Sequence, residues 1–585
     1  MSAPLGSRFG GARAVPWAIA ALTVLVFSPA LWNGFVDWDD QVNLVGNVAY
    51  RGLGWTQLSW MFTTTLMGHY IPLTWLSFGL DYTLWGMNPL GYHLTSILLH
   101  AASAAVLFLI AGRLIQRARP DAQPAVAQAG AALAALVFAL HPLRAESVAW
   151  ATERRDVLSG LLVLLAVLAY VRGADAAAVR PWGWRLAALG CFVAAILAKS
   201  IVMTLPLILL ILNIYPLRRL GGAAGWWTPA ARPVWWEKLP FVVVGVVGAE
   251  LAWWAVARGG FFKPSASYAL AERLAVAAYG GAFYVVKTLV PLGLSPLYEM
   301  PLRVRPLEPR FLLSALLLIG ITLAVWLGRR RWPAALAAWV GYLVLLAPVS
   351  GFVHSGYQLA HDRYSYLACL PFALLVGGLP LWLRRDRVPG RRPAATLAGG
   401  AVLAAGVLAL ATLTWQQVQI WRSSESLWAH AVVVDPRCAI CHDELGAALL
   451  RRGQAAPAIV HFQRVLDLRP EMTRAEGSIG LALLQSGRPA DAEVRLKRAL
   501  DAHPDSVPYL YQLGTALLAQ RRFGEAEHPL RRAVALRPDA AEPRMALAEA
   551  YLALGDPALA REQYETARRL NPALAPLSRI FIPGS

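Results

Sequence analysis

Apolar runs of membrane-spanning length fill residues 1–420. A transmembrane helix needs about 20 apolar residues to cross a hydrocarbon core of about 30 Å. Eleven runs meet or approach this length, at residues 15–32, 92–115, 127–143, 156–172, 184–199, 201–217, 239–257, 311–328, 332–350, 364–383 and 395–415. Only 15% of the residues are charged, against about 25% in soluble domains. The sequence therefore predicts a polytopic membrane domain and excludes a wholly soluble enzyme.

Positive charge is concentrated beside these runs. The formal net charge is +19, and residues 421–585, with 21 basic and 19 acidic side chains, contribute only +2 of it. Arginine clusters adjoin the runs at Arg113/Arg117/Arg119, Arg172/Arg180/Arg185, Arg218/Arg219, Arg329/Arg330/Arg331 and Arg384/Arg385/Arg387/Arg391/Arg392. Short loops rich in Arg and Lys are typically cytoplasmic. The charge thus indicates membrane topology, and it does not favour a nucleic-acid partner.

The arginine clusters also fix the number of crossings, because an even number must separate two cytoplasmic loops. A further apolar stretch at 273–293 would break this parity, and it carries Arg273 and Lys287. We expect it to form an interfacial or re-entrant helix on the outer side. The prediction is eleven spans, the first being a signal anchor, with a cytoplasmic N-terminus and residues 421–585 outside. A twelve-span arrangement is the alternative.

Residues 421–585 repeat with a period of 34. Pro436, Pro470, Pro504, Pro538 and Pro572 keep this spacing, as do Ala458, Ala492, Ala526 and Ala560, and Gly446, Gly480 and Gly514. A helix–turn–helix unit of this length is typical of the tetratricopeptide repeat. We predict full repeats at 439–472, 473–506, 507–540 and 541–574, with a half repeat at 422–434. The predicted fold class is all-α, a membrane domain at 1–420 followed by an α-solenoid at 421–585.

A solenoid of this kind has a concave groove that commonly binds an extended peptide. An array that only spaces or dimerises the chain is the alternative. One turn departs from the pattern, because Arg521 stands where Gly453, Gly487 and Gly555 mark the equivalent position.

Ionisable residues outside the arginine clusters fall mostly in the predicted outer loops. Asp39 and Asp40 follow the first span. One carboxylate could accept a proton from a substrate hydroxyl while the other orients it. Together with Asp37 they could instead bind a divalent cation, or they form a solvated turn.

Basic side chains on the same side could bind a phosphate at the membrane surface. They are His141, Arg144, Arg154, Lys199, His361 and Arg363. Arginine suits this role because its planar fork matches two phosphate oxygens. Glu146, Asp156 and Asp362 could alternatively pair with these bases as structural bridges.

Several short motifs resemble one known family. They are Phe35 to Asn43, Tyr70 to Thr74, Gly91-Tyr92-His93-Leu94 through His100, His141-Pro142 with Glu146, Arg154 and Asp156, and Asp362-Arg363-Tyr364 through Leu367. With a C-terminal repeat array, they resemble the transmembrane-and-tetratricopeptide-repeat O-mannosyltransferases and their bacterial relatives, of the GT-C class. Two positions depart from the family pattern: Arg144 replaces a His, and Asp362 replaces a Glu.

The resemblance implies a sugar, possibly mannose, carried on a polyprenyl phosphate, and an acidic catalytic residue matching Asp39 or Asp40. We therefore expect a membrane glycosyltransferase that inverts the sugar's anomeric centre and transfers it to a hydroxyl acceptor on the outer face. The six basic residues would bind the donor phosphate, and His93, Glu146, Asp156, Asp362 and Tyr364 would support them. The repeats would hold an acceptor polypeptide. A non-catalytic membrane-anchored scaffold for assembly of envelope proteins is the rival interpretation.

Cys438, Cys441 and His442 match the C-x-x-C-H pattern of haem attachment. We favour a local disulfide or two packed thiols over haem, since a compact repeat array offers no obvious room for the cofactor. The strong preference for Arg over Lys favours a bacterial inner membrane, with the repeats in the periplasm. The need for a divalent cation stays open.

Overall fold

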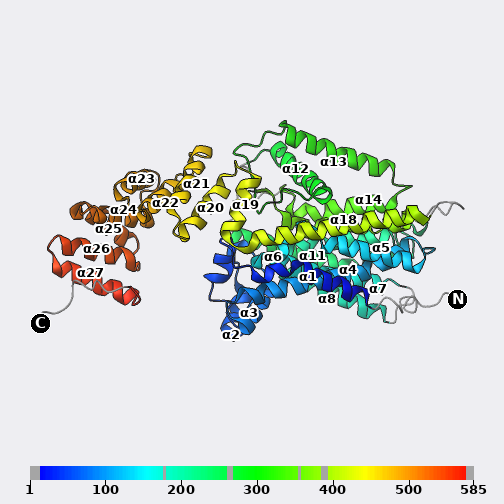
Figure 1. The fold of residues 1–585 in the computed structure, drawn as a ribbon. Coiled ribbons are helices and arrows are strands. Elements are labelled where there is room, and N and C mark those ends of the chain that lie inside the picture. The colour runs from blue at the N-terminus through cyan, green and yellow to red at the C-terminus, as the bar shows by residue number, and fades with distance from the viewer. Residues whose placement is uncertain (1–13, 176–179, 260–267, 353–357, 384–392, 575–585) are drawn as a thin grey trace. The chain divides into compact units, whose positions relative to one another are not determined.

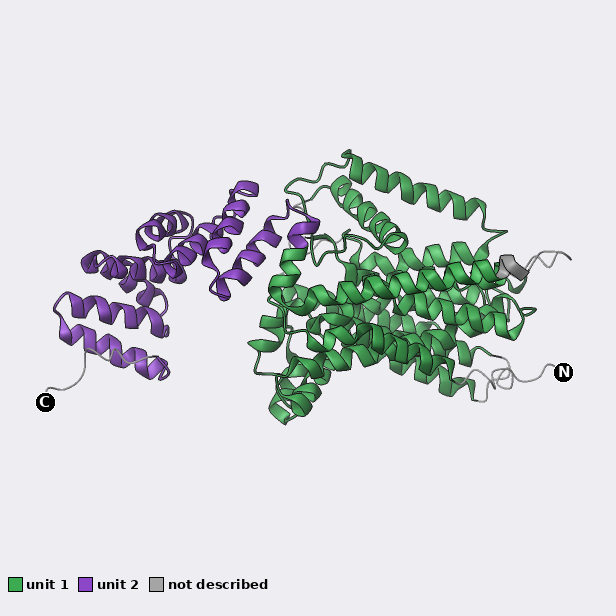
Figure 2. Ribbon diagram, in the orientation of Figure 1, with its two compact units in different colours: residues 1–430 green, residues 431–585 purple. Residues whose placement is uncertain are grey.

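The computed structural model describes residues 14–175, 180–259, 268–352, 358–383 and 393–574. It divides into two compact units, residues 1–430 and 431–585 (Figure 2). The first unit holds the apolar helices and the second holds the repeats, each a stack of helices (Figure 1). The predicted fold class, a helical membrane domain followed by a tetratricopeptide solenoid, is confirmed. The boundary lies at residue 430, within helix α19 (Ser424–Val434).

In the described part of the chain, seven helices are long and apolar enough to cross a membrane. Three of them are single helices, α4 (Pro89–Ala118), α8 (Pro181–Ala198) and α13 (Pro309–Leu327). The other four are segments named here with the helices that they contain: Val15–Trp32 with α1 (Val15–Phe27), Ala151–Gly173 with α7 (Arg154–Gly173), Arg232–Arg258 with α10 (Arg232–Trp236) and α11 (Leu239–Arg258), and Leu397–Arg422 with most of α18 (Pro393–Gln419). Only 6% of the most apolar window of α13 is buried. Such exposed apolar faces fit contact with lipid chains.

Two of the predicted spans are helices that are broken near one end. The first joins α5 (Pro124–Ala139) to Pro142–Ala149, which contains α6 (Ala145–Ala149), with a bend of 54°. The second joins Asp362–Ala368, containing α15 (Ser365–Ala368), to α16 (Leu370–Val376) and α17 (Leu379–Leu383), with a bend of 58°. Two shorter apolar segments complete the correspondence with the eleven predicted runs, Ser200–Ile214 with α9 (Leu205–Ile214) and Pro333–Val349 with α14 (Pro333–Leu346).

The stretch at 273–293 contains an unbroken helix rather than a re-entrant loop. This helix, α12 (Leu270–Leu289), packs along α13 (Figure 1). After it the chain forms β1 (Tyr298–Glu299), which pairs antiparallel with β2 (Gln358–Ala360). The pairing of Tyr298 with Ala360 brings the loop after α12 against the start of the second broken span.

The first predicted outer loop is itself folded. It contains α2 (Trp55–Thr63) and α3 (Pro72–Trp85), and an apolar cluster of Leu44, Tyr50, Met61, Ile71, Trp75, Phe78, Tyr92 and Ala151 closes it onto the helices. Burial of such large aromatic side chains contributes roughly 1.5–3 kcal/mol each. The loop is therefore fixed in place, and with it the carboxylates near its start.

The second unit is built from four helical hairpins. They pair α20 (Ala439–Arg451) with α21 (Ala455–Leu468), α22 (Arg474–Gln485) with α23 (Pro489–Ala502), α24 (Val507–Ala519) with α25 (Phe523–Leu536), and α26 (Ala541–Ala553) with α27 (Pro557–Leu570). A Cβ atom added at Gly480 would lie 2.6 Å from Leu496 Cγ. The spaced glycines therefore permit the close approach of the two helices in a hairpin.

The turn inside each hairpin needs a left-handed backbone. Its φ is 75° at Gly453, 68° at Gly487 and 85° at Gly555, and Arg521 holds the same conformation with a φ of 59°. This conformation costs a non-glycine residue about 1–2 kcal/mol.

We expect Arg521→Gly to raise the free energy of unfolding by about 0.5–1 kcal/mol, because relief of backbone strain exceeds the added entropy of the unfolded chain. The measurement is the apparent melting temperature of the purified chain. Gly487→Ala is the matched control and should lower that temperature. An unchanged or lower melting temperature for Arg521→Gly would show that the turn is not strained.

Candidate active site

Loops from four parts of the first unit meet in a network of charged side chains. We call it the ionic cluster: Asp39, Glu146, Glu153, Arg155, Asp156, Lys199 and Arg363. The two broken spans supply Glu146 and Arg363, and the start of α7 supplies Arg155 and Asp156. Because the spans bend, Glu146 and Arg363 lie inside the protein. In an unbroken span these ionisable residues would have to lie in the lipid.

Arg363 lies at the centre of the cluster. Its Nη1 atom is 2.5 Å from Glu146 Oε1, its Nε atom is 3.2 Å from Glu153 Oε1, and its backbone N–H donates to Glu146 Oε2 at 2.9 Å. Lys199 Nζ bridges two further carboxylates, at 3.0 Å from Glu153 Oε2 and 2.6 Å from Asp156 Oδ1. The predicted bases and acids therefore meet, and in this arrangement the bases are paired with carboxylates.

The two adjacent aspartates take different positions. Asp40 is fully buried and accepts three hydrogen bonds, from Val36 N at 2.9 Å, Thr152 N at 3.0 Å and Thr152 Oγ1 at 2.5 Å. These bonds tie the first outer loop to the start of the α7 segment. Asp39 keeps 24% of its side chain exposed, and its carboxylate lies 3.8 Å from Arg155 Nη2.

Burial raises the pKa of both carboxyls, because desolvation disfavours the charged form. It raises the pKa of Asp40 to about 6, even though hydrogen bonds from Thr152 and Val36 oppose the shift. The pKa of Asp39 is also raised by burial, while the Arg155 guanidinium acts in the opposite direction. Asp39 is thus the accessible carboxylate, with a raised affinity for protons, beside a buried ionic network.

The adjacent arginines of α7, Arg154 and Arg155, likewise have different partners. Arg155 pairs with Glu153 inside the cluster. Arg154, fully buried, pairs with Asp81 and donates from Nη2 to Tyr92 O at 2.6 Å. Its guanidinium also lies 4.6 Å from the centre of the Phe78 ring. The structure therefore places Arg154 in the packing of the first outer loop, apart from the cluster.

The predicted histidines make structural contacts. His141 Nε2 donates to Thr288 O at 3.1 Å, and its Nδ1 accepts from Leu143 N at 3.3 Å. His361 Nδ1 donates to Pro296 O at 3.0 Å, and burial lowers its pKa well below the usual range. His93 is buried within α4. A neutral His361 can still offer Nε2 as a hydrogen-bond acceptor.

The remaining predicted residues surround the cluster. Asp362 Oδ1 accepts from Tyr298 OH at 3.0 Å, and the Arg363 guanidinium lies 5.1 Å from the centre of the Tyr364 ring. Arg144 is buried, with its guanidinium 5.6 Å from the centres of the Phe138 and Tyr366 rings. Among the described residues, no group of three or more His, Cys, Asp or Glu is arranged to hold a metal ion.

A cavity of about 700 Å³ begins at the cluster, where Asp156, Arg363 and Tyr364 line it. It continues between α4, α7, α9 and α14 and the broken span of α15 to α17, and most of its lining is aliphatic. Side chains from Pro333 to Leu345 of α14 line its length, which corresponds to roughly 20 Å of helix. The cavity is therefore a long apolar slot with an ionic site at one end.

The candidate site residues predicted from the sequence did not include Glu153, Arg155 and Asp81. The run Glu153-Arg154-Arg155-Asp156 was the available signal. Successive residues of a helix point about 100° apart, so Arg154 and Arg155 point in different directions. The pattern alone does not say that Arg154 meets Asp81 while Arg155 meets Glu153.

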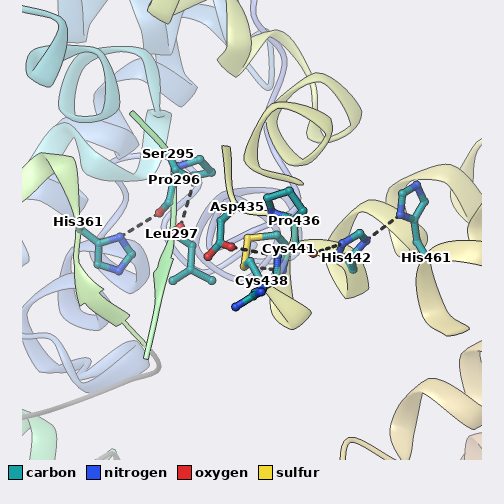
Figure 3. The surroundings of a disulfide bond; sticks show 11 residues. Ser295, Pro296, Leu297, His361, Asp435, Pro436, Cys438, Cys441, His442 and His461 are labelled. Atoms are coloured by element: carbon teal, nitrogen blue, oxygen red, sulfur yellow. Dashed lines mark hydrogen bonds between the residues drawn. A yellow bond between two sulfur atoms is a disulfide. The ribbon is translucent and has the colours of Figure 1, made fainter. Parts of the chain in front are cut away.

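In the second unit, Cys438 and Cys441 form a disulfide at the start of α20 (Figure 3). The two cysteine sulfurs of the C-x-x-C-H motif are thus bonded to each other. His442 Nδ1 lies 2.9 Å from His461 Nδ1, and its Nε2 donates to Pro436 O at 3.2 Å. Burial lowers the pKa of both imidazoles.

Comparison with known proteins agrees with both units. A tetratricopeptide-repeat family model matches residues 444–507, 478–541 and 511–575. Crystal structures of MamA resemble the chain over a quarter of its length. One covers 25% of this chain and 85% of MamA at 17% identity, but its TM-score of 0.24 is too low to support a conclusion.

Curated relatives match the membrane domain as well. Protein O-mannosyl-transferase Tmtc3 of Drosophila melanogaster is 25% identical over 69% of this chain and 48% of its own length. Protein O-mannosyl-transferase TMTC1 of Homo sapiens is 26% identical over 80% of this chain and 57% of its own length. The mouse TMTC1 is 34% identical over 29% of this chain and 19% of its own length. The chain thus spans about half the length of the first two relatives. In its apolar helices and in its repeats, this chain is thus similar to the TMTC proteins.

Proposed function

We propose that the chain is a membrane glycosyltransferase that moves a sugar from a polyprenyl-phosphate donor to a hydroxyl group. The observation that carries this proposal is an accessible carboxylate, Asp39, beside an ionic cluster at the end of a long apolar cavity. A carboxylate that can accept a proton, placed at the end of a long apolar cavity, fits a substrate that carries a lipid chain. The names of the relatives favour mannose as the sugar and a protein Ser or Thr as the acceptor.

The donor's hydrocarbon chain would lie in the cavity. Its aliphatic lining offers a prenyl chain the same environment as the bilayer, and Arg363 and Tyr364 at its end would meet the phosphate. A guanidinium can bind two phosphate oxygens at once. Arg363, with Lys199 as its neighbour through Glu153, would stabilise the negative charge that develops as the sugar leaves.

Asp39 would act as the general base. In its ionised form it would accept the proton of the acceptor hydroxyl while that oxygen attacks the anomeric carbon opposite the phosphate, which inverts the configuration. Asp40 would hold the loop, since its oxygens are already occupied by Val36 and Thr152. The loops around the site would also be positioned by Arg154, His141 and Arg144. Arg363 and Lys199 are therefore the residues that we propose contact the phosphate.

The repeat unit would bind the acceptor polypeptide or a partner protein. Tetratricopeptide arrays offer an extended concave surface for peptides. We further propose a bacterial inner-membrane location, with a cytoplasmic N-terminus and periplasmic repeats. The arginine clusters between the apolar helices support this orientation.

A purified, reconstituted chain tests the donor class. We expect it to transfer mannose to a Ser- and Thr-containing peptide from mannosyl phosphoryl polyprenol, and not from a nucleotide-linked mannose. Arg363→Gln should abolish the transfer. Equal transfer from the nucleotide donor, or none from the lipid donor in an active fold, would contradict the proposal.

The rate of transfer should rise with pH through the pKa of Asp39. The base is active when ionised, and burial raises its pKa above the usual value of 3.8, so the acid limb should lie above the ordinary range of an exposed aspartate. The measurement is kcat/KM as a function of pH. The residual activity of Asp39→Asn should lack this limb, and an identical limb in that variant would assign the titration to another group.

A further inference from the structure

The end of the cavity opposite the ionic cluster, which we call the second mouth, is lined by arginines. Arg119, Arg218, Arg330 and Arg331 line that end, together with the aromatic residues Tyr215 and Trp332. They lie at the end of α4, after α9 and before α14. One apolar slot thus joins an ionic site at one end to a group of arginines at the other.

Other arginines near this end are already engaged. Arg117 pairs with Asp175, and both Arg185 and Arg219 pair with Glu237. The Arg329 guanidinium lies 4.5 Å from the centre of the Trp326 ring, and the Arg331 guanidinium lies farther from an aromatic ring, 5.7 Å from the centre of the Trp332 ring. Arg119 has one distant and exposed partner, Asp121 at 3.5 Å. Within the described ranges, Arg218, Arg330 and Arg331 have no carboxylate within 4.0 Å.

The side chains of the neighbours Arg218 and Arg219 have different surroundings. Arg218 adopts a left-handed φ of 53°, which costs about 1–2 kcal/mol in a residue other than glycine. Arg219 turns to Glu237, at 2.7 Å from Nη1 to Oε1, while Arg218 lines the cavity. Strain of this kind persists where the surrounding structure enforces it, often at binding sites.

We propose that this second mouth is a binding site for the phosphate of a single-chain lipid, a polyprenyl monophosphate, whose chain enters the cavity from this end. Three guanidinium groups without carboxylate partners match a phosphate monoester, which carries about −1.5 to −2 charges, better than a phosphodiester with one. A single cavity of about 700 Å³, lined by α4, α7, α9, α14 and the span of α15 to α17, suits one lipid chain better than two. Tyr215 and Trp332 suit the interface between the lipid chain and its head group.

The site goes beyond the proposed transfer, because inverting sugar transfer at Asp39 needs no phosphate contact at the opposite end of the cavity. The inference rests on the proposed function only in taking the cavity to hold a lipid chain. It implies that the sugar-free carrier, the product of transfer, can be held with its phosphate at either end of the slot. The carrier could then enter or leave by the mouth remote from the chemistry.

Binding to the full chain in phosphatidylcholine nanodiscs tests the site, with sugar-free polyprenyl monophosphate as the probe. The wild type should bind it, and the double variant Arg330→Gln/Arg331→Gln should bind about tenfold or more weakly. Arg218→Gln should also weaken binding. Arg329→Gln is the matched control for each single variant, Arg330→Gln and Arg331→Gln, because it removes one charge from the same arginine cluster but Arg329 does not line the cavity. A photoactivatable prenyl chain should label α9 and α14.

Equal weakening by Arg329→Gln would overturn the proposal, because a general surface charge would then explain the binding. Equally effective competition by phosphatidylglycerol or by inorganic phosphate would overturn it too, since the site would not select a single-chain lipid monoester. Binding unchanged in both the Arg330→Gln/Arg331→Gln double variant and Arg218→Gln would have the same meaning. Asp39→Asn should bind the probe normally, so a failure of the transfer chemistry stays distinguishable from a failure of this site.

Discussion

Replacement of Asp39 with Asn is expected to reduce sugar transfer by about 10²- to 10⁴-fold, the usual contribution of a general base. Asparagine preserves the size of the side chain but cannot accept the hydroxyl proton. Because 24% of the side chain is exposed and its nearest charged partner is Arg155 at 3.8 Å, the substitution should leave the fold intact. The measurement is the initial rate with the lipid donor, alongside the melting temperature.

Asp40→Asn is the matched control for this prediction. It removes the charge from a fully buried carboxylate that accepts hydrogen bonds from Val36 and Thr152. An amide keeps one acceptor oxygen, so two of the three bonds can survive at most. We expect a lower melting temperature and a smaller loss of rate per folded molecule. The reverse pattern, full activity in Asp39→Asn and none in a folded Asp40→Asn, would transfer the role of base to Asp40.

Removal of the Arg154 charge should be strongly destabilising. Arg154→Gln would leave Asp81 as a buried, uncompensated carboxylate, with side chains that are 0% and 3% exposed in the intact pair. Breaking a buried ion pair from one side costs about 3–5 kcal/mol. The measurement is unfolding of the purified chain by denaturant or heat, in the absence of any lipid donor.

The double variant Asp81→Leu/Arg154→Met separates structure from catalysis. Replacing both partners with apolar groups of similar volume is often nearly neutral, so the double variant should recover most of the stability. If Arg154 only positions the loop, transfer should recover with it. A stable double variant without transfer would instead place Arg154 among the phosphate contacts, as the sequence suggested.

Much of the fold was predictable because its signals are periodic. The eleven apolar runs correspond to seven long helices, two broken ones and two short apolar segments in the described residues. The 34-residue period marked the hairpins, and the glycines at 453, 487 and 555 marked their left-handed turns. Hydropathy alone does not show the bends near His141 and Cys369, because a broken span has the same hydropathy as a straight one. The prolines beside them, Pro142 and Pro371, are the local signal.

The candidate site was predictable in composition but not in detail. In Asp39-Asp40 and in Arg154-Arg155, two identical neighbours differ in their surroundings, one buried in structural contacts and one in the ionic cluster. Residue identity cannot separate such neighbours, since the choice depends on long-range partners such as Thr152 and Asp81. The disulfide between Cys438 and Cys441 likewise required geometry, because the spacing also fits other chemistry.

Mass spectrometry of outer-face proteins, from cells with and without this chain, tests the central claim most directly. The account predicts that a defined set of Ser- or Thr-containing peptides loses a hexose when the chain is deleted. The modification should return with the wild-type gene and not with Asp39→Asn. Peptides modified to the same extent in deleted and complemented cells, or full restoration by Asp39→Asn, would contradict it.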